Sequence, residues 1–282
     1  MKLNNTCSKI FIPDQTEVAK AISRTTHMSI AAHQDDIEIM AYHGISECFQ
    51  NAEKWFFGVV VTDGRGSART GKYADYTNEQ MMKVRQLEQE KAAVIGEYGA
   101  LVQLNYSSSQ TKDINDQQIT DDLKTLLLQA QPEVLYTHNL ADKHDTHIGV
   151  VTKVIKALRQ IPKELRPKKV LGCEVWRALD WINDSEKITL DTDRHPNLAS
   201  ALVEVFDSQI IGGKRYDLAA LGRRIANATY FESHQVDASK SLIYAMDLTP
   251  LIIDDSLDVS NYVLRYIQRF EEDVKNKIKR MM

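Results

Sequence analysis

The sequence predicts an α/β protein with a Rossmann-like, three-layer fold around a mostly parallel sheet. Short apolar and β-branched runs alternate along the chain with longer amphipathic segments, a pattern typical of strands joined by crossover helices. The 282 residues include only 12 Gly and 6 Pro, which argues against long linkers. We therefore expect one domain over residues 1–282, with a core at about 26–180 and a C-terminal extension at about 181–282.

The first elements are a strand, a second strand and a long helix. Residues 28–33 form a short buried run, and residues 55–64 are rich in aromatic and β-branched side chains before a turn. Residues 78–99 have the composition of a strong helix. We expect Asn78 to cap its start and Gly99 to end it.

Two strand–helix units follow in the middle of the chain. A strand is expected at residues 100–104, and an amphipathic helix at 116–131 ends before Pro132. The next strand is expected at residues 133–138 and the next helix at 147–161. This regular alternation indicates parallel pairing with right-handed crossovers.

The last third of the chain is harder to interpret and contains no readable motif. One more strand is expected at residues 168–176, followed by helices at 197–210 and 215–231. Residues 241–253 predict one or two strands near a sheet edge, and residues 261–280 a terminal amphipathic helix.

The composition excludes several classes of function. With 35 Lys+Arg against 39 Asp+Glu, the net charge is −4, so nucleic acid is not an expected partner. No apolar run reaches the ~18 residues of a membrane span, and the N-terminus lacks a secretory signal. Three scattered cysteines without a CxxC motif suggest reduced thiols and a cytoplasmic protein.

Polar clusters follow three of the expected strands. They occupy residues 33–36, 63–66 and 138–147. In an open α/β sheet, ligands bind beyond the carboxyl ends of the strands, so all three clusters are expected at one edge.

The first and third of these clusters contain the side chains of a metal site. One His and one Asp from residues 33–36, with one His from residues 138–147, would supply the three ligands of a catalytic zinc site. Bound water would become a nucleophile, and a second carboxylate could take its proton. Two alternatives stay open: Asp35 or Asp36 caps a helix starting near Ile37, and His144 and His147 are exposed at a helix start.

Together, the two clusters resemble the signatures of the PIG-L/LmbE family of metal-dependent amino-sugar N-deacetylases. The first signature, roughly AHPDD, appears as AHQDDIEIMAYHG, and the second, roughly NDxHxDH, appears as ADKHDTH. Between them lie a TDG turn at 62–64 and a helix that matches the family pattern at Arg85 and Glu88. The ordered match covers roughly residues 28–160.

The resemblance implies a ligand set and two catalytic groups. It makes His33, Asp36 and His147 the metal ligands, with Zn²⁺, Fe²⁺ or another divalent ion as cofactor. Asp35 matches the general base. His144 matches the imidazole that, once protonated, stabilises the oxyanion or protonates the leaving amine. Relatives often form trimers or hexamers, so the resemblance also implies a homo-oligomer.

Two departures from the family pattern affect the loops. Gln34 replaces the usual Pro, which implies a less rigid loop. Thr146 replaces the Asp that normally helps to orient the catalytic imidazole, and Asp145 sits one place early. Asp142 matches an acidic position of uncertain role. Either Asp142 or Asp145 therefore substitutes for the missing Asp, or His144 is differently tuned.

Three residues are expected to contact the substrate. Arg85 matches a sugar-facing position in some members, although an intrahelical pair with Glu88 explains it equally well. Asp63 follows the second strand, and Arg177 follows a strand near the same edge. Trp176 is expected in the core.

These features together predict a hydrolase that removes the acetyl group from an N-acetylglucosamine-type sugar or conjugate. Two alternatives remain: a hydrolase of a non-sugar amide with the same metal centre, and a metal- or sugar-binding protein without turnover. Retention of Asp35 beside a full ligand set disfavours the last, because binding alone needs no base.

Overall fold

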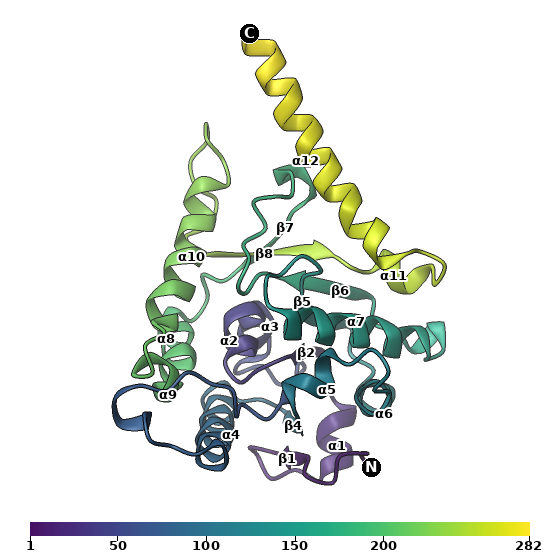
Figure 1. The fold of residues 1–282 in the computed structure, drawn as a ribbon, viewed down its shortest axis with the longest axis vertical. Coiled ribbons are helices and arrows are strands. Elements are labelled where there is room, and N and C mark those ends of the chain that lie inside the picture. The colour runs from purple at the N-terminus through teal and green to yellow at the C-terminus, as the bar shows by residue number, and fades with distance from the viewer.

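The apolar runs form one sheet of eight strands in the computed structural model, which describes residues 1–282 (Figure 1). The strand order across the sheet is β1-β4-β3-β2-β5-β6-β8-β7. The strand bounds are β1 Lys9–Phe11, β2 His27–Ala31, β3 Phe56–Thr62, β4 Ala100–Tyr106, β5 Val134–His138, β6 Lys169–Cys173, β7 Ile188–Asp191 and β8 Leu242–Asp247.

The centre of the sheet is parallel and its margins are antiparallel. Strands β4, β3, β2, β5 and β6 all run in one direction, whereas β1, β8 and β7 run opposite to their neighbours. The prediction of a mostly parallel sheet is therefore confirmed. From β2 the chain continues outward through β3 and β4, then returns to place β5 on the other side of β2. The carboxyl ends of β2 and β5 consequently flank the topological switch point.

Helices cover both faces of the sheet, which gives the predicted three layers. Along β3, Phe57 and Val59 join one hydrophobic cluster with α1, α6 and α7, while Phe56 and Val60 join another with α2, α3, α4 and α8. The helix bounds are α1 Val18–Ser23, α2 Asp36–Met40, α3 Tyr42–Cys48, α4 Asn78–Ile95, α5 Ser108–Lys112, α6 Gln118–Ala130, α7 Asp145–Arg159, α8 Pro196–Glu204, α9 Asp207–Ile210, α10 Tyr216–Tyr230, α11 Pro250–Ile253 and α12 Val259–Met281.

The long helix α4 begins and ends differently from the prediction. Thr77, not Asn78, is the N-cap, and its side chain accepts a hydrogen bond from the backbone of Gln80 in a capping box. The helix ends at Gly96, three residues before Gly99. A side chain at Gly96 would meet the Tyr98 ring at 2.6 Å, so only glycine fits this close approach.

The helix expected at 197–210 is broken into α8 and α9. Phe206 has ψ 58°, outside the helical range, and its side chain is buried. Directly after it, the backbone N–H and the hydroxyl of Ser208 both donate to Glu88, each at 2.7 Å. This contact with α4 fixes the first turn of α9 and separates it from α8.

The expectation for residues 241–253 is partly wrong. Residues 242–247 form β8, which lies next to the edge strand β7, so a strand near an edge is confirmed. Pro250–Ile253 is helical and not a second strand. The true edge strand, β7, was not predicted. Beyond it, α12 extends away from the sheet to the C-terminus (Figure 1). No helix has both the length and the apolar character needed to cross a bilayer.

Candidate metal centre

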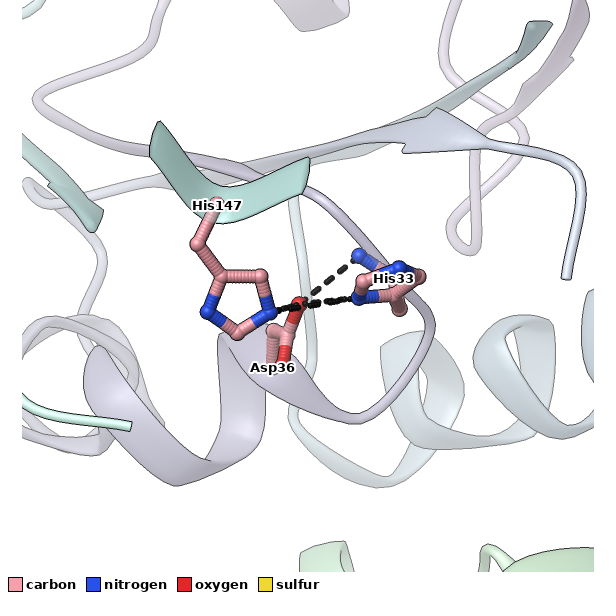
Figure 2. Close-up of side chains that lie close together, drawn as sticks. All are labelled: His33, Asp36 and His147. Atoms are coloured by element: carbon pink, nitrogen blue, oxygen red, sulfur yellow. Dashed lines mark hydrogen bonds and ion pairs between the residues drawn. The ribbon is translucent and has the colours of Figure 1, made fainter. Parts of the chain in front are cut away.

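Two loops bring a metal-binding set of side chains together at the switch point. His33 and Asp36 follow β2, and His147 lies in the first turn of α7, after β5. Because β2 and β5 pair directly, the segments that leave their carboxyl ends start side by side. Figure 2 shows the three side chains converging, with the Asp36 carboxylate between the two imidazole rings.

The three donor atoms form a nearly equilateral triangle. His33 Nδ1 lies 3.2 Å from Asp36 Oδ2 and 3.2 Å from His147 Nε2, and the third side, from His147 Nε2 to Asp36 Oδ2, is 3.3 Å. Ligand atoms that surround zinc tetrahedrally at about 2.0–2.2 Å lie roughly 3.3–3.5 Å apart. The set therefore fits one divalent ion with a fourth position left open.

The charges in this cluster favour a cation. Burial alone would raise the pKa of Asp36, but His147 and hydrogen bonds from His147 and His33 hold it well below its usual range. Burial alone would lower the pKa of His147, but the carboxylates of Asp36 and Asp142 raise it to about 9. Without a metal, a proton on His147 therefore supplies the positive charge that Asp36 requires.

Asp142 positions His147, the third member of the triangle. Its carboxylate lies 3.5 Å from His147 Nδ1, on the side of the ring that faces away from the triangle. It also accepts hydrogen bonds from the backbone of His144 and Trp176, each at 3.0 Å. Such a carboxylate fixes the tautomer and raises the basicity of a ligating imidazole.

The His144 ring accepts a hydrogen bond from the backbone. It is the N-cap residue of α7, and its Nδ1 accepts a hydrogen bond from the Thr146 N–H at 3.3 Å. That leaves the proton on Nε2. Burial and the neighbouring His33 and His147 lower the pKa of His144 to about 4, so the ring is neutral near pH 7. Asp142 contacts His144 only through the backbone N–H of that residue, so orientation of the ring by Asp142 or Asp145 stays a prediction.

A fourth histidine supports the triangle without joining it. His138 stacks on His147 with 3.8 Å between ring centroids, and its Nε2 accepts a hydrogen bond from the Ala32 N–H at 2.8 Å. That nitrogen lies 3.7 Å from Asp36 Oδ2 and is already engaged. His138 therefore ties β5 to the end of β2.

Asp35 faces the same site but is held by a buried arginine. Arg85, on α4, donates to Asp35 Oδ2 at 2.8 Å, to the carbonyl of Gln34, and to Glu88 at 3.2 Å. The predicted pair with Glu88 is thus confirmed, and a sugar contact by Arg85 stays a prediction. Burial raises the pKa of Asp35 to about 7 against the opposing effect of Arg85.

The backbone at Asp35 is strained and is locked by a polar network. Its φ is +83°, a region that residues other than glycine rarely adopt. Its N–H donates to Gln89 at 3.2 Å, and Gln89 in turn donates to the buried Glu38 at 2.7 Å. Tyr98 also donates to Glu38, at 2.6 Å. Strain of this kind persists where the surroundings over-determine the conformation, commonly at functional sites.

Gln34, which replaces the usual proline, anchors the loop by its side chain. The Gln34 side chain is fully buried and donates to the Thr62 carbonyl at 3.2 Å, which ties the loop to the end of β3. Gly64 then passes close by with φ +76°, and a Cβ there would lie 2.6 Å from Gln34 Oε1. Only glycine meets both conditions. The loss of loop rigidity expected from the replacement of proline stays a prediction.

The triangle opens into a polar cavity of about 470 Å³. His33, Asp35, Asp36 and His144 form its floor, and α5 and the α9–α10 region contribute the outer wall. The outer wall residues include Ser67, Ser108, Lys112, Gln209, Lys214 and Tyr216. Their hydroxyl, amide and ammonium groups suit a ligand with many hydrogen-bonding groups.

A comparison with protein families identifies this arrangement. Residues 28–158 match the family described as PIG-L: GlcNAc-PI de-N-acetylase. Over this range, which is a little under half of the 282 residues, the chain is similar to that family. The matched range contains every member of the triangle together with Asp35, Asp142 and His144. No curated protein matches the chain as a whole.

Solved structures share the fold at low sequence identity. N,N'-diacetylchitobiose deacetylase from Pyrococcus horikoshii is 14% identical, with a TM-score of 0.65 over 84% of this chain and 88% of that one. The A40926 pseudoaglycone deacetylase Dbv21 is 13% identical (TM-score 0.58; 80% and 98%). GalB, the 4-carboxy-2-hydroxymuconate hydratase from Pseudomonas putida, is 15% identical (TM-score 0.57; 79% and 96%).

Two of the predicted substrate contacts, Asp63 and Arg177, do not line the cavity. The Asp63 carboxylate is buried and pairs with Arg65 Nε at 2.7 Å, and it does not line the 470 Å³ cavity. Arg177 is exposed and is also absent from that wall. Both contacts stay predictions.

Trp176 is partly buried: it packs against the hydrophobic cluster that contains Phe56 and Val60, as expected, and it also lines the cavity. Strand β6 ends at Cys173, three residues before the predicted end, and the chain then turns across the site. Sequence reasoning also missed Tyr216 and Lys214, which follow no motif. The only signal was their place at the start of the predicted helix 215–231: Lys214 directly precedes it and Tyr216 lies in its first turn.

Proposed function

We propose that this protein is a metal-dependent N-deacetylase that hydrolyses the acetyl amide of an amino sugar or its conjugate. One observation supports this most: three ligand atoms 3.2–3.3 Å apart open into a polar cavity that also exposes Asp35 and His144. The PIG-L family match supports the same reaction.

His33, Asp36 and His147 would hold the ion, which we propose to be Zn²⁺, with Fe²⁺ as the alternative. Two imidazoles and one carboxylate suit either metal. A divalent ion at this position acidifies a water molecule and polarises a carbonyl group.

Asp35 and His144 would then move and stabilise charge. Asp35 takes a proton from the attacking water as general base. The neutral His144 donates its Nε2–H to the oxygen that becomes negative as the amide carbon turns tetrahedral. The C–N bond then breaks and the proton passes to the departing nitrogen, so the products are acetate and a free amino sugar. Unlike the sequence-based scheme, this role needs no imidazolium.

The experiment pairs metal content with amine release. We expect the purified protein to contain about one divalent ion per chain and to release amine from N-acetylglucosamine derivatives. Asp35→Asn should keep the metal but lose roughly 10²- to 10⁴-fold in kcat. Asp145→Asn, which changes an exposed carboxylate in the same region, serves as the matched control. Full turnover by Asp35→Asn would refute the base assignment.

The fold alone does not fix the substrate, because it is also that of GalB, a hydratase. A panel of acetylated sugars and non-sugar amides, scored by amine release, separates the leading proposal from a non-sugar amidase. Metal content with no hydrolysis of any amide would favour a binding protein without turnover.

We also propose a cytoplasmic location and a homo-oligomer. All three cysteines are free thiols, and Cys48 and Cys173 are buried, which is usual in a reducing compartment. Cell fractionation tests the location, and light scattering of the purified protein tests for a trimer or hexamer.

A further inference from the structure

A second, smaller cavity adjoins the metal triangle. It has a volume of about 110 Å³ and shares Asp35, Asp36, Trp176 and Tyr216 with the large polar cavity, so the two meet at the carboxylates. The rest of its wall is mostly apolar. Those residues are Ile39 of α2, Val175, and Ala219, Ala220 and Arg223 of α10.

The chemistry of this wall suits an alkyl group and not a sugar. A sugar hydroxyl placed against these side chains would lose its hydrogen bonds to water without replacement, at a substantial cost. Arg223 is the one charged residue among them, and its guanidinium donates to the carbonyl of Val175. The polar groups gather instead in the larger cavity.

The two cavities meet at Asp35 and Asp36, so an amide held at the triangle can extend into both. A scissile amide at the triangle extends in one direction through its nitrogen, toward the sugar, and in the other through its carbonyl carbon, toward the acyl chain. With the sugar in the polar cavity, the acyl chain is left to occupy the apolar one.

The volume exceeds what an acetyl group needs. An apolar cavity of about 150 Å³ holds benzene, with six carbons, so a cavity of 110 Å³ holds an alkyl chain of roughly three or four carbons. A single methyl group would leave much of this space without contacts.

We infer that the cavity between α2, Val175 and α10 binds the acyl chain of the substrate, and that this protein hydrolyses amides of short fatty acids such as butyrate in preference to acetate. This inference rests on the proposed hydrolase function and extends it. Water supplies a hydroxyl to the acyl carbon, the C–N bond breaks, and the products are butyrate and a free amine.

Two alanines of α10 keep this space open. Ala220 is 8% exposed and lies in the wall, whereas Ala219 is exposed and lies at the mouth. A leucine at Ala219 would therefore extend over the mouth without disturbing the core. Val175 offers the opposite change, because truncation to alanine enlarges the cavity.

The test uses the metal-loaded protein and one glucosamine derivative acylated with acetyl, propionyl, butyryl or hexanoyl groups. We expect kcat/KM to rise about tenfold from acetyl to butyryl, because two more methylene groups are buried. Ala219→Leu should remove most of this preference, and Val175→Ala should shift it toward hexanoyl. Gly222→Leu is the matched control: a Cβ there meets nothing within 4 Å, and the residue lines neither cavity. The ratio of kcat/KM for the butyryl substrate to kcat/KM for the acetyl substrate should be the same in Gly222→Leu as in the unaltered protein.

The failure of this inference differs from the failure of the proposed function. Hydrolysis of the acetyl amide with no preference for butyryl, or a preference that Ala219→Leu does not alter, would overturn the inference and leave the deacetylase intact. If no amide is cleaved, the hydrolase proposal falls.

In that case binding still tests the cavity. Calorimetry with sodium acetate and sodium butyrate should give about tenfold tighter binding of butyrate, lost in Ala219→Leu. Equal affinities, or no binding of either carboxylate, would overturn the inference.

Discussion

The floor and the wall of the cavity are built in different ways. The floor comes from two loops within residues 28–158, where ligands and catalytic groups stand at fixed separations in the chain. The wall comes in part from later residues: Trp176, Lys214 and Tyr216 line the polar cavity, and two alanines of α10 line the smaller cavity beside it. A metal ion needs defined donor atoms in a defined geometry, which leaves a signature. A wall needs only shape and polarity, which many sequences provide.

Removing a metal-binding residue should have the largest effect on metal content and turnover. His147→Ala takes away one corner of the triangle, so we expect metal content to fall to background and turnover to fall roughly a thousandfold or more. His234→Ala, at an exposed histidine, is the control and should match the unaltered protein. Because His147 is buried, circular dichroism of the variant must show that it is folded. A folded variant that keeps the metal would remove His147 from the ligand set.

The pH dependence of metal binding should be set by His147. His147 binds a metal only as the neutral imidazole, and its pKa in the metal-free protein is raised to about 9. Below that pH the metal must displace a proton from His147. The apparent affinity for the metal should therefore fall about tenfold for each unit by which the pH is lowered. Competition titrations between pH 6 and 8 measure this slope. Lys214→Ala, a wall variant, should show the same slope, and a flat profile would contradict the assignment.

Loss of the hydrogen bond between α9 and α4 should affect the stability of the protein more than its chemistry. Ser208 Oγ of α9 donates to the buried Glu88 at 2.7 Å. Ser208→Ala should lower the free energy of unfolding by about 1–3 kcal/mol, because a buried charged acceptor loses a donor. Ser200→Ala removes an equally short hydrogen bond to Glu204 at an exposed position. Denaturant unfolding should show at most about 0.5 kcal/mol for that control.

The smallest effect is expected at the rim of the wall. Lys214 lines the polar cavity and lies 5.0 Å from the Trp176 ring centroid. Lys214→Ala should raise KM roughly three- to tenfold by removing a charged hydrogen-bond donor, with little change in kcat. Arg177→Ala, at an exposed position off the cavity, should change KM less than twofold. The reverse order would restore Arg177 as a substrate contact.

The sequence predicted what depends on local patterns. The parallel strands were found because buried strands are continuous apolar runs. The meeting of His33 and His147 could be expected because ligands bind where the carboxyl ends of the strands meet. The one-domain division and the catalytic roles stay predictions.

What could not be predicted depends on contacts distant in the chain. The break between α8 and α9 follows from Glu88, 120 residues before Ser208. The hydrogen bond from the Thr146 N–H to His144 could not be predicted, because almost any residue at position 146 supplies the same backbone donor. The place of Trp176 in the wall followed from the early end of β6 and an anchor on Asp142.

The placement of α7 has a further electrostatic consequence. Its first turn lines the cavity at His144 and Thr146, and the helix continues for 15 residues away from it. The aligned peptide dipoles add the equivalent of roughly half a positive charge at that end. The dipole of α7 therefore stabilises negative charge that develops in the cavity. Because peptide dipoles do not titrate, it does so whatever the protonation of the surrounding side chains.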